Sequence, residues 1–306
     1  MSEIAEIVER LSPILGEPSG EPAPLEGGIT NRNYRVTLGG DEYVVRLPGK
    51  DTNLLEIDRL AELAASELAA EAGVAPKVAA MLEDPPCLVA EFLGARTMTA
   101  EELRGPGCLT DVAADLRAIH GAGQDLPNSF SAFRIVETYA ATAAERGADV
   151  PDDYDEAHGH ARRIEAALTG PEHKPVPCHN DLLAANFLHD GERLWIVDWE
   201  YAGMGDRYFD LGNFAVNNEL TADDEFALLT AYFDERPPAR RLAALGLMRF
   251  MSDFREAMWG VVQTAVSDLD FDFADYARKH FDRLRVQAAD SRFDRWLEDA
   301  GDGSSG

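Results

Sequence analysis

One stretch of the chain, Cys178–Asn213, holds the side chains whose types and spacing are best suited to chemistry. Asp181 is followed by Asn186 and, after an apolar run, by Asp198. Between the last two, an Asp-Gly pair at 190–191 is a strong hairpin-turn signal with apolar flanks. Such a hairpin would bring Asn186 and Asp198 together at its open end, near Asp181. Amide and carboxylate oxygens suit Mg²⁺, and Asp181 could accept a proton.

This arrangement is the one that phosphoryl transfer uses in kinase-like folds. There, one aspartate receives the hydroxyl proton, while an asparagine and a later aspartate bind the metal. Taken singly, Asp181 also suits a helix N-cap and Asp198 a strand end. The pattern H-N-D-x-x-x-x-N, then I-V-D-W-E-Y-A-G and F-D-L-G-N, resembles the choline/ethanolamine kinase family, within the larger group that includes aminoglycoside phosphotransferases.

The resemblance implies a role for each of these residues. Asp181 would orient or deprotonate the acceptor hydroxyl, and His179 would hold the backbone of the catalytic loop. Asn186 and Asp198 would ligate Mg²⁺. Glu200 would be a further ligand or an acid that faces the substrate.

Other polar residues are expected to be structural. Asp210, in F-D-L-G-N, matches the aspartate that braces the catalytic loop from a following helix, and His120 is expected to be structural too. His158 and His160 stand two apart on a predicted helix and so point to different faces. That spacing does not favour a metal pair, and we expect both on a solvated surface.

Composition indicates a soluble globular protein. The chain has 306 residues, of which 45% are hydrophobic, and no apolar run approaches the ~18 residues of a membrane span. The first residues lack the basic segment of a signal peptide. The 3 cysteines are odd in number and form no C-x-x-C pair, which disfavours disulfides and structural zinc. We therefore expect a cytoplasmic protein with no membrane partner.

The formal net charge of −28 limits the possible partners. It argues against nucleic acid, whose phosphates would be repelled. ATP is also an anion, so an ATP site must concentrate its positive groups locally and add Mg²⁺. Only Lys50, Lys77, Lys174 and Lys279 are lysines. An acidic, lysine-poor surface fits a halophilic source, and a GC-rich genome explains the lysine shortage equally well.

The N-terminal part has strand and helix signals. An amphipathic helix and a Pro/Gly-rich linker are expected within residues 1–25, followed by two strand arms, Asn33–Leu38 and Glu42–Leu47. A helix is predicted over Asn53–Ala72, ended by Gly73. A short apolar strand follows Pro85-Pro86.

The resemblance identifies candidate nucleotide-binding residues in this part. The Gly-Gly-Ile-Thr-Asn segment matches a family nucleotide loop, although an ordinary hairpin loop also explains it. Arg46 matches the position of a phosphate-pairing residue. Alternatively, Arg46 lies on the solvated face of an edge strand. Glu62 would hold Arg46 in place, with Glu67 as a rival. Main-chain groups of the 91–93 hinge would bind adenine. The predicted set is Gly28, Thr30, Asn31, Arg46, Glu62, Glu91 and Leu93.

The acceptor pocket is expected in the C-terminal part. Trp259 and Tyr276 match two ring positions of the choline kinase pocket, and Phe271 would supply a third. Each ring face contributes about 0.5–2 kcal/mol to binding a cation. Helix-packing core explains the three rings equally well. Two positions depart from the family pattern: Val262 replaces a tryptophan, and Asn217, a candidate substrate contact, replaces a glutamate.

The expected fold is α+β, a bilobal protein-kinase-like fold. Residues 1–94 would form a small N-lobe with an antiparallel sheet and one helix, and residues 95–306 a larger, mainly helical C-lobe with a disordered tail at 301–306. Helices are predicted through 108–170 with a loop at 121–131, from Pro237-Pro238 to Val266, and from about Phe273 through Trp296.

The expected activity is ATP- and Mg²⁺-dependent phosphorylation of a small cationic alcohol, such as choline or ethanolamine, by a monomer or homodimer. One alternative is a kinase of the same fold that acts on thiamine, an aminoglycoside or a sugar-like alcohol. Another is a non-catalytic nucleotide-binding protein with a kinase fold, against which the intact Asp181, Asn186 and Asp198 argue.

Overall fold

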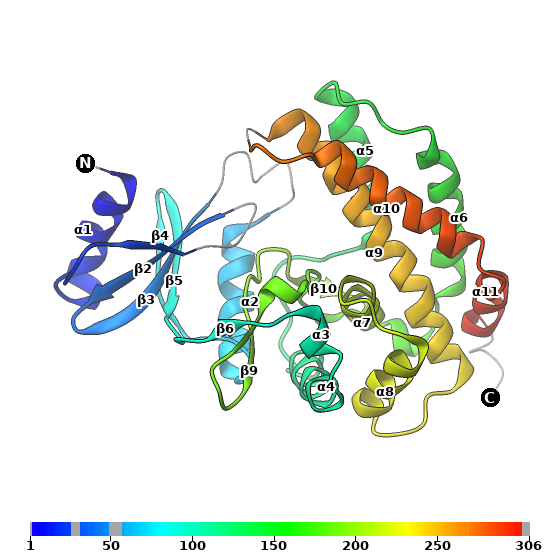
Figure 1. The fold of residues 1–306 in the computed structure, drawn as a ribbon, viewed down its shortest axis with the longest axis horizontal. Helices are drawn as coiled ribbons and strands as arrows, with labels where there is room; N and C mark the ends of the chain where they lie inside the picture. Colours follow the sequence, from blue (N-terminus) through cyan, green and yellow to red (C-terminus); the bar gives the residue numbers. More distant parts are fainter. Residues whose placement is uncertain (1, 26–30, 49–56, 268, 302–306) are drawn as a thin grey trace. The chain divides into compact units, whose positions relative to one another are not determined.

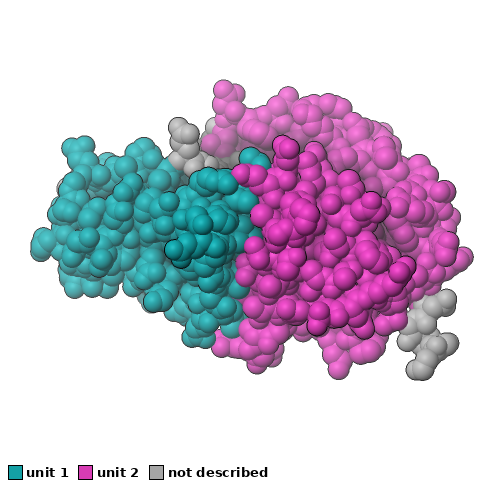
Figure 2. Space-filling model, turned by 60° about the horizontal axis from the view of Figure 1, so that its bottom comes forward, with its two compact units in different colours: residues 1–99, 185–201 teal, residues 100–184, 202–306 magenta. Residues whose placement is uncertain are grey.

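A computed structural model describes residues 2–25, 31–48, 57–267 and 269–301. The chain forms two compact units, which Figure 2 colours separately: residues 1–99 with 185–201, and residues 100–184 with 202–306. The first unit contains an antiparallel sheet, and the second is mainly helical (Figure 1). The predicted α+β class is thus confirmed, whereas the lobe boundary near Gly94 stays a prediction.

The main sheet of the first unit has the strand order β1-β2-β3-β5-β4, with every neighbouring pair antiparallel. The two predicted arms are β2 and β3, joined by a turn at Gly39 and Gly40, where φ is 64° and 100°. These left-handed values favour glycine. The strands are β1 (Ala23–Leu25), β2 (Asn31–Leu38), β3 (Asp41–Pro48), β4 (Val78–Glu83) and β5 (Pro86–Glu91).

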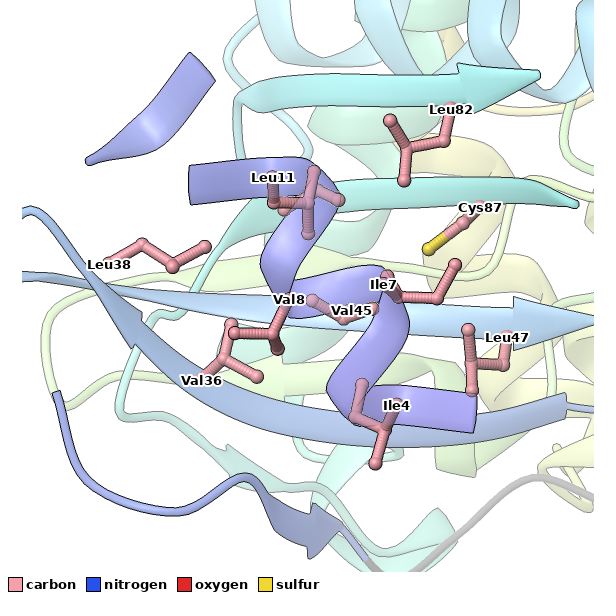
Figure 3. Packing of buried hydrophobic residues seen from close by; sticks show 11 residues of the cluster. Ile4, Ile7, Val8, Leu11, Val36, Leu38, Val45, Leu47, Leu82 and Cys87 are labelled. Atoms are coloured by element: carbon pink, nitrogen blue, oxygen red, sulfur yellow. The ribbon is translucent and has the colours of Figure 1, made fainter. Parts of the chain in front are cut away.

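Helix α1 (Glu3–Leu15) packs its apolar face on this sheet, as Figure 3 shows. The amphipathic helix predicted at the N-terminus is therefore confirmed. The buried cluster joins one side of α1 to side chains of β2–β5, and burial of this apolar area stabilises the unit. Its members are Ile4, Ile7, Val8, Leu11, Val36, Leu38, Val45, Leu47, Leu82, Cys87 and Val89.

Helix α2 (Arg59–Glu71) begins later than predicted. Residues 57 and 58 are not helical, and the Asp58 carboxylate accepts the backbone N–H groups of Leu60 and Ala61 at 2.8 and 3.2 Å. The helix start predicted at Asn53 is therefore wrong, because Asp58 is an N-cap. Residues 53–56 lie outside the described residues.

The predicted hairpin of the central stretch is present in the first unit. Strand β8 (Phe187–His189) pairs antiparallel with β9 (Leu194–Ile196), and β6 (Arg96–Thr97) adds to β8. The Asp190 carboxylate accepts two backbone N–H groups of the turn at 2.8 and 2.9 Å. At the other end, the Val197 N–H donates to the Asn186 carbonyl at 3.0 Å. Asn186 and Asp198 therefore both stand at the open end, as predicted.

The long helix α9 (Ala239–Val266) organises the second unit and packs against α5, α7, α10 and α11. Its bounds agree with the prediction. The other elements are α3 (Ala100–Leu103), α4 (Pro106–His120), α5 (Ala132–Glu145), α6 (Asp153–Ala167), β7 (Val176–Cys178), β10 (Gly203–Gly205), α7 (Arg207–Asn217), α8 (Ala222–Phe233), α10 (Phe273–Ala288) and α11 (Phe293–Gly301), with 3-10 turns at Pro171–His173 and Ala184–Asn186.

The single C-terminal helix predicted from Phe273 is wrong, because α10 ends at Ala288 and α11 begins at Phe293. Between them, the Asp290 carboxylate accepts the Arg292 N–H at 2.8 Å in a local turn. Gly301 is helical, against the predicted disordered tail, and residues 302–306 lie outside the described part. Among the described helices, none has the length and apolar character needed to cross a bilayer. A cytoplasmic location stays a prediction.

Candidate active site

Arg46 on β3 is the centre of a buried polar cluster in the first unit. Its Nη1 lies 3.0 Å from Glu62 Oε1 on α2 and 2.6 Å from Asp198 Oδ1 after β9. The ion pair expected between Arg46 and Glu62 is therefore present, and the rival Glu67 is exposed. Arg46 points inward, so the alternative of a solvated strand face is excluded.

A second arginine closes the cluster. Arg59 Nη1 lies 2.6 Å from Glu62 Oε2 and 3.1 Å from Glu200 Oε2. Asn31 Nδ2 donates to the same Glu200 oxygen at 3.0 Å. Sequence reasoning missed Arg59, although its place three residues before Glu62 on a helix is a usable signal. The predicted residues Asn31, Glu62 and Glu200 thus share one site.

The cluster has more carboxylates than cations. Glu62, Asp198 and Glu200 face two guanidinium groups, so one negative charge is in excess when all are ionised. Burial raises the pKa of Asp198 to about 7; Arg46 opposes this, and Glu200 and Glu62 add to it. Burial acts to lower the pKa of Arg46, but attraction to Asp198, Glu62 and Glu200 raises it overall.

The donor set at the hairpin end fits a hard divalent cation. Asp198 has a φ of 69°, a left-handed conformation that costs of order 1–3 kcal/mol and is concentrated at functional sites. Asn186 beside it is buried. An amide oxygen, a carboxylate and an excess of negative charge are what Mg²⁺ coordination requires. The residues present therefore fit this metal.

In the second unit, the loop that carries Asp181 is braced by Asp210 on α7. The Asp210 carboxylate accepts the backbone N–H groups of His179 and Asn180 at 2.8 and 2.7 Å. The Asp181 N–H donates to His179 Nδ1 at 3.1 Å. The predicted bracing by Asp210 is thus confirmed, and His179 holds the loop backbone. His120 Nε2 lies 3.1 Å from Asp210, in a structural position.

The ligand atoms of His120, Cys178 and Asp210 lie within 4.8 Å of one another and are buried. The other ring nitrogen of His120 lies 2.8 Å from the Tyr232 hydroxyl. Burial raises the pKa of the Cys178 thiol well above its ordinary value, with Asp210 adding to the effect. A metal prefers the thiolate. Of this group, His120 and Asp210 take part in the hydrogen-bonded brace of the loop.

A buried ion pair on α9 reaches Asp181. Arg255 Nη1 lies 3.4 Å from Asp181 Oδ1 and also donates to Glu256 Oε1, while the Tyr276 hydroxyl donates to Glu256 Oε2 at 2.6 Å. Burial acts to raise the pKa of Glu256, but Arg255 and His280 lower it overall. Burial and the Glu256 charge raise the pKa of Tyr276. Sequence reasoning assigned no role to Arg255 or Glu256, although both stand within four residues of Trp259 on the same helix.

The three predicted rings belong to one aromatic cluster. The centroids of Trp259 and Tyr276 lie 5.7 Å apart, and those of Phe271 and Tyr276 lie 6.0 Å apart. Phe273, not predicted, contacts both Trp259 and Phe271 at 5.7 and 4.8 Å. Asn217 ends α7, and none of the described contacts of these rings involves it; its Nδ2 is buried with no partner among the described residues.

The remaining predicted nucleotide contacts are only partly described. Gly28 and Thr30 lie outside the described residues. The N–H groups of Glu91 and Phe92 donate to the carbonyls of Lys77 and Glu42 at 2.9 and 3.0 Å. These two N–H groups thus already donate to main-chain carbonyls of the first unit. A contact to adenine from Leu93 stays a prediction, as does the approach of Asp181 to the magnesium ligands.

Comparison with known proteins gives concordant matches. The model of the phosphotransferase enzyme family matches residues 21–245. A choline/ethanolamine kinase family protein from Mesorhizobium loti is 31% identical, with a TM-score of 0.84 over 97% of this chain and 99% of that chain. Choline kinase LicA from Streptococcus pneumoniae is 24% identical, with a TM-score of 0.77 over 94% and 99%.

Among sequence relatives, ethanolamine kinase 2 of Rattus norvegicus is 26% identical over 285 residues, which cover 84% of this chain and 73% of that protein. The two solved structures share their fold with this chain over nearly its whole length. The fold predicted from the family resemblance is therefore confirmed.

Proposed function

Because the chain belongs to the phosphotransferase enzyme family, and within it to the choline/ethanolamine kinase family, we propose that it transfers the γ-phosphoryl group of ATP to the hydroxyl of a small amino alcohol, such as choline or ethanolamine. The observation that carries this proposal is the cluster of Arg46, Glu62 and Asp198 in the first unit. A cation held by a buried glutamate is a fixed charge for nucleotide phosphates, and it needs no reorganisation when the phosphates bind.

Asn186 and Asp198 would hold Mg²⁺, with Glu200 as a further candidate ligand. When bound, the metal would neutralise the negative charge of the nucleotide phosphates. Arg46 would contact a phosphate, and Glu62 and Arg59 would keep its guanidinium in place. The excess negative charge of this cluster supports the assignment, since a divalent cation offsets it.

Asp181 would accept the hydroxyl proton of the acceptor or orient that hydroxyl. Its loop is fixed by Asp210 through two backbone hydrogen bonds, which supports precise positioning. Phosphoryl transfer has a loose transition state in most analyses, so alignment of the hydroxyl matters more than strong deprotonation.

The aromatic cluster around Tyr276 would receive the amine of the acceptor. Trp259, Phe271 and Phe273 offer ring faces and edges, and the buried carboxylate of Glu256 lies against the Tyr276 hydroxyl. Rings attract a quaternary ammonium by cation–π interaction, and a carboxylate attracts an ammonium that can donate hydrogen bonds. Both features suit a cationic alcohol.

A panel of acceptors with ATP and Mg²⁺ tests this proposal. Release of ADP is measured with choline, ethanolamine, thiamine, an aminoglycoside and a sugar alcohol, each against a sample without acceptor. We expect acceleration by choline or ethanolamine. If only thiamine, the aminoglycoside or the sugar alcohol accelerates ADP release, that compound class becomes the acceptor in place of the amino alcohol. If no amino alcohol accelerates ADP release, the proposal of an amino alcohol acceptor is wrong.

A further inference from the structure

Among the described side chains that are almost completely enclosed, Arg255 is the largest, with 2% of its surface exposed. Burial of a guanidinium is costly unless carboxylates surround it. Arg255 stands in the middle of α9 and faces two carboxylates, Glu256 on the same helix and Asp181 on the catalytic loop. A purely structural ion pair would need Glu256 alone.

The contacts form a continuous chain from the aromatic cluster to the proposed base. The Tyr276 hydroxyl donates to one oxygen of Glu256 at 2.6 Å, and Arg255 donates to the other. The same nitrogen, Arg255 Nη1, lies 3.4 Å from Asp181 Oδ1. That distance is long for a hydrogen bond, but the two opposite charges still attract each other at this separation in a buried setting.

The backbone brace leaves the orientation of the Asp181 side chain to other groups. Asp210 and His179 bind main-chain N–H groups of the loop, so they fix the Cα position of Asp181. Arg255 instead contacts the carboxylate itself. A base works only when its reacting oxygen is aligned with the hydroxyl, and a displacement of about 1 Å costs about 100-fold in rate.

We propose that Arg255 is a positioning residue, which holds the Asp181 carboxylate in its orientation through a buried contact and is itself aligned by Glu256 and Tyr276. Arg255 acts through Asp181 and does not touch the reacting atoms. The inference rests on the proposed function, in which Asp181 is the base. It extends that function, because a continuous series of hydrogen bonds and ion pairs joins the aromatic cluster to Asp181.

The test compares kcat and KM in Arg255→Met, Glu256→Gln and the double variant that carries both. Removal of Arg255 alone leaves the Glu256 charge buried without its cation, which itself destabilises the fold, whereas the double variant removes both charges. Thermal unfolding of each variant reports folding separately. Arg249→Met is the matched control, since Arg249 lies on the same helix and pairs with Glu225, away from Asp181.

We expect kcat to fall about 100-fold in Arg255→Met and to stay low in the folded double variant, while KM for ATP is unchanged. Glu256→Gln, which weakens one of the two contacts that align Arg255, should lower kcat less than Arg255→Met does and should raise KM for the amino alcohol. Arg255→Lys, which keeps the charge, should recover part of kcat, and Arg249→Met should match the parent protein.

Recovery of the parent kcat in the double variant would overturn the proposal and leave Arg255 and Glu256 as a structural ion pair. Failure of the proposed function is detected in a separate measurement, before the Arg255 variants are compared. If the parent protein phosphorylates no amino alcohol, or if Asp181→Asn keeps its turnover, there is no base to position, and both proposals fall.

Discussion

At the residue scale, Asp198 has an environment that a metal ion would relieve. Its carboxylate is held by one cation, Arg46, and repelled by Glu62 and Glu200, and burial raises its pKa to about 7. Its backbone is in a left-handed conformation. A structural aspartate at a strand end needs none of these features, so they favour the role of metal ligand that we propose.

Asp198→Asn tests this role through stability. Mg²⁺ with ADP should raise the unfolding temperature of the parent protein, because a ligand that binds only the folded state stabilises it by mass action. The variant should lose most of this rise. Asp190→Asn, which alters a carboxylate at the opposite end of the same hairpin, should keep it. An undiminished rise in Asp198→Asn would exclude Asp198 as a ligand.

The sequence predicted those site residues that belong to family motifs. Arg46, Glu62 and Asp198 could be identified because each matches a family motif. The predicted Arg46–Glu62 ion pair is present, and the structure adds an Arg46–Asp198 contact that was not predicted. Arg59 and Arg255 were not, because an arginine on a helix is solvent-exposed by default. Only tertiary packing buries these two beside carboxylates, and single-sequence patterns do not report it.

At the element scale, the F-D-L-G-N segment of α7 shows why glycine occupies its fourth position. A Cβ on Gly212 would lie 2.8 Å from the backbone of Met248 and Arg249 on α9. On either side of Gly212, Asp210 braces the loop that carries Asp181, and Asn213 Nδ2 donates to Ser252 Oγ at 2.9 Å. The close approach of α7 to α9 thus supports the loop that carries Asp181.

Gly212→Ala should therefore destabilise the protein by about 1–3 kcal/mol, since the added methyl group must displace helix backbone. Urea unfolding measures this free energy. Gly159→Ala on α6 is the control: its Cβ meets nothing within 4 Å, and it should stabilise by about 0.5–1 kcal/mol. Equal stabilities of the two variants would contradict the packing argument.

His160 links helices α6, α9 and α11. We expected it on a solvated surface, and that was wrong: its ring is half-buried and contacts Phe250 and Phe293, with centroids at 5.8 and 5.2 Å. The pKa of His160 is lowered by burial and by Arg163, against Glu156 and Asp294. Helical periodicity does not show which face a later helix will cover.

The sign of the pH effect follows from this depressed pKa. The unfolded chain takes up the His160 proton near pH 6.5, before the folded protein does, so stability present above about pH 6.5 is lost as the pH falls. His160→Phe, which keeps a ring between Phe250 and Phe293, should lose less unfolding free energy than the parent between about pH 7.5 and pH 5. An equal loss would refute a role for His160.

Local chemistry made some elements predictable from sequence and others not. The β8–β9 hairpin follows from its Asp-Gly turn, and α9 from its length and its N-terminal prolines. The start of α2 was misplaced because the apolar residues Leu54, Leu55 and Ile57 precede the true cap at Asp58 and extend the helical pattern. The strands β1, β7 and β10 are three residues each, which is too short for a clear alternation pattern, and β7 and β10 pair with each other across a long stretch of sequence.

At the scale of the whole molecule, the net charge of −28 is the main electrostatic feature. Like charges repel one another in a compact chain, and salt screens exposed charges over a Debye length of about 10 Å at 0.1 M. The buried clusters around Arg46 and Arg255 are screened much less. The surface and the interior should therefore respond differently to salt.

We expect the free energy of unfolding to rise as NaCl increases from about 0.05 M to about 0.5 M, because self-repulsion weakens. Urea titrations at both concentrations measure it. Sucrose at matched osmolality controls for general solute effects. A fall in stability with salt would show that exposed ion pairs outweigh the repulsion.

The central claim is that Asp181 directs phosphoryl transfer from ATP to an amino alcohol. Mass spectrometry of the products after incubation with ATP, Mg²⁺ and choline or ethanolamine tests it most directly. The parent protein should form the phosphate monoester of at least one of these alcohols, and Asp181→Asn should form none above background. Consumption of ATP without either ester, or an equal yield from Asp181→Asn, would contradict the account.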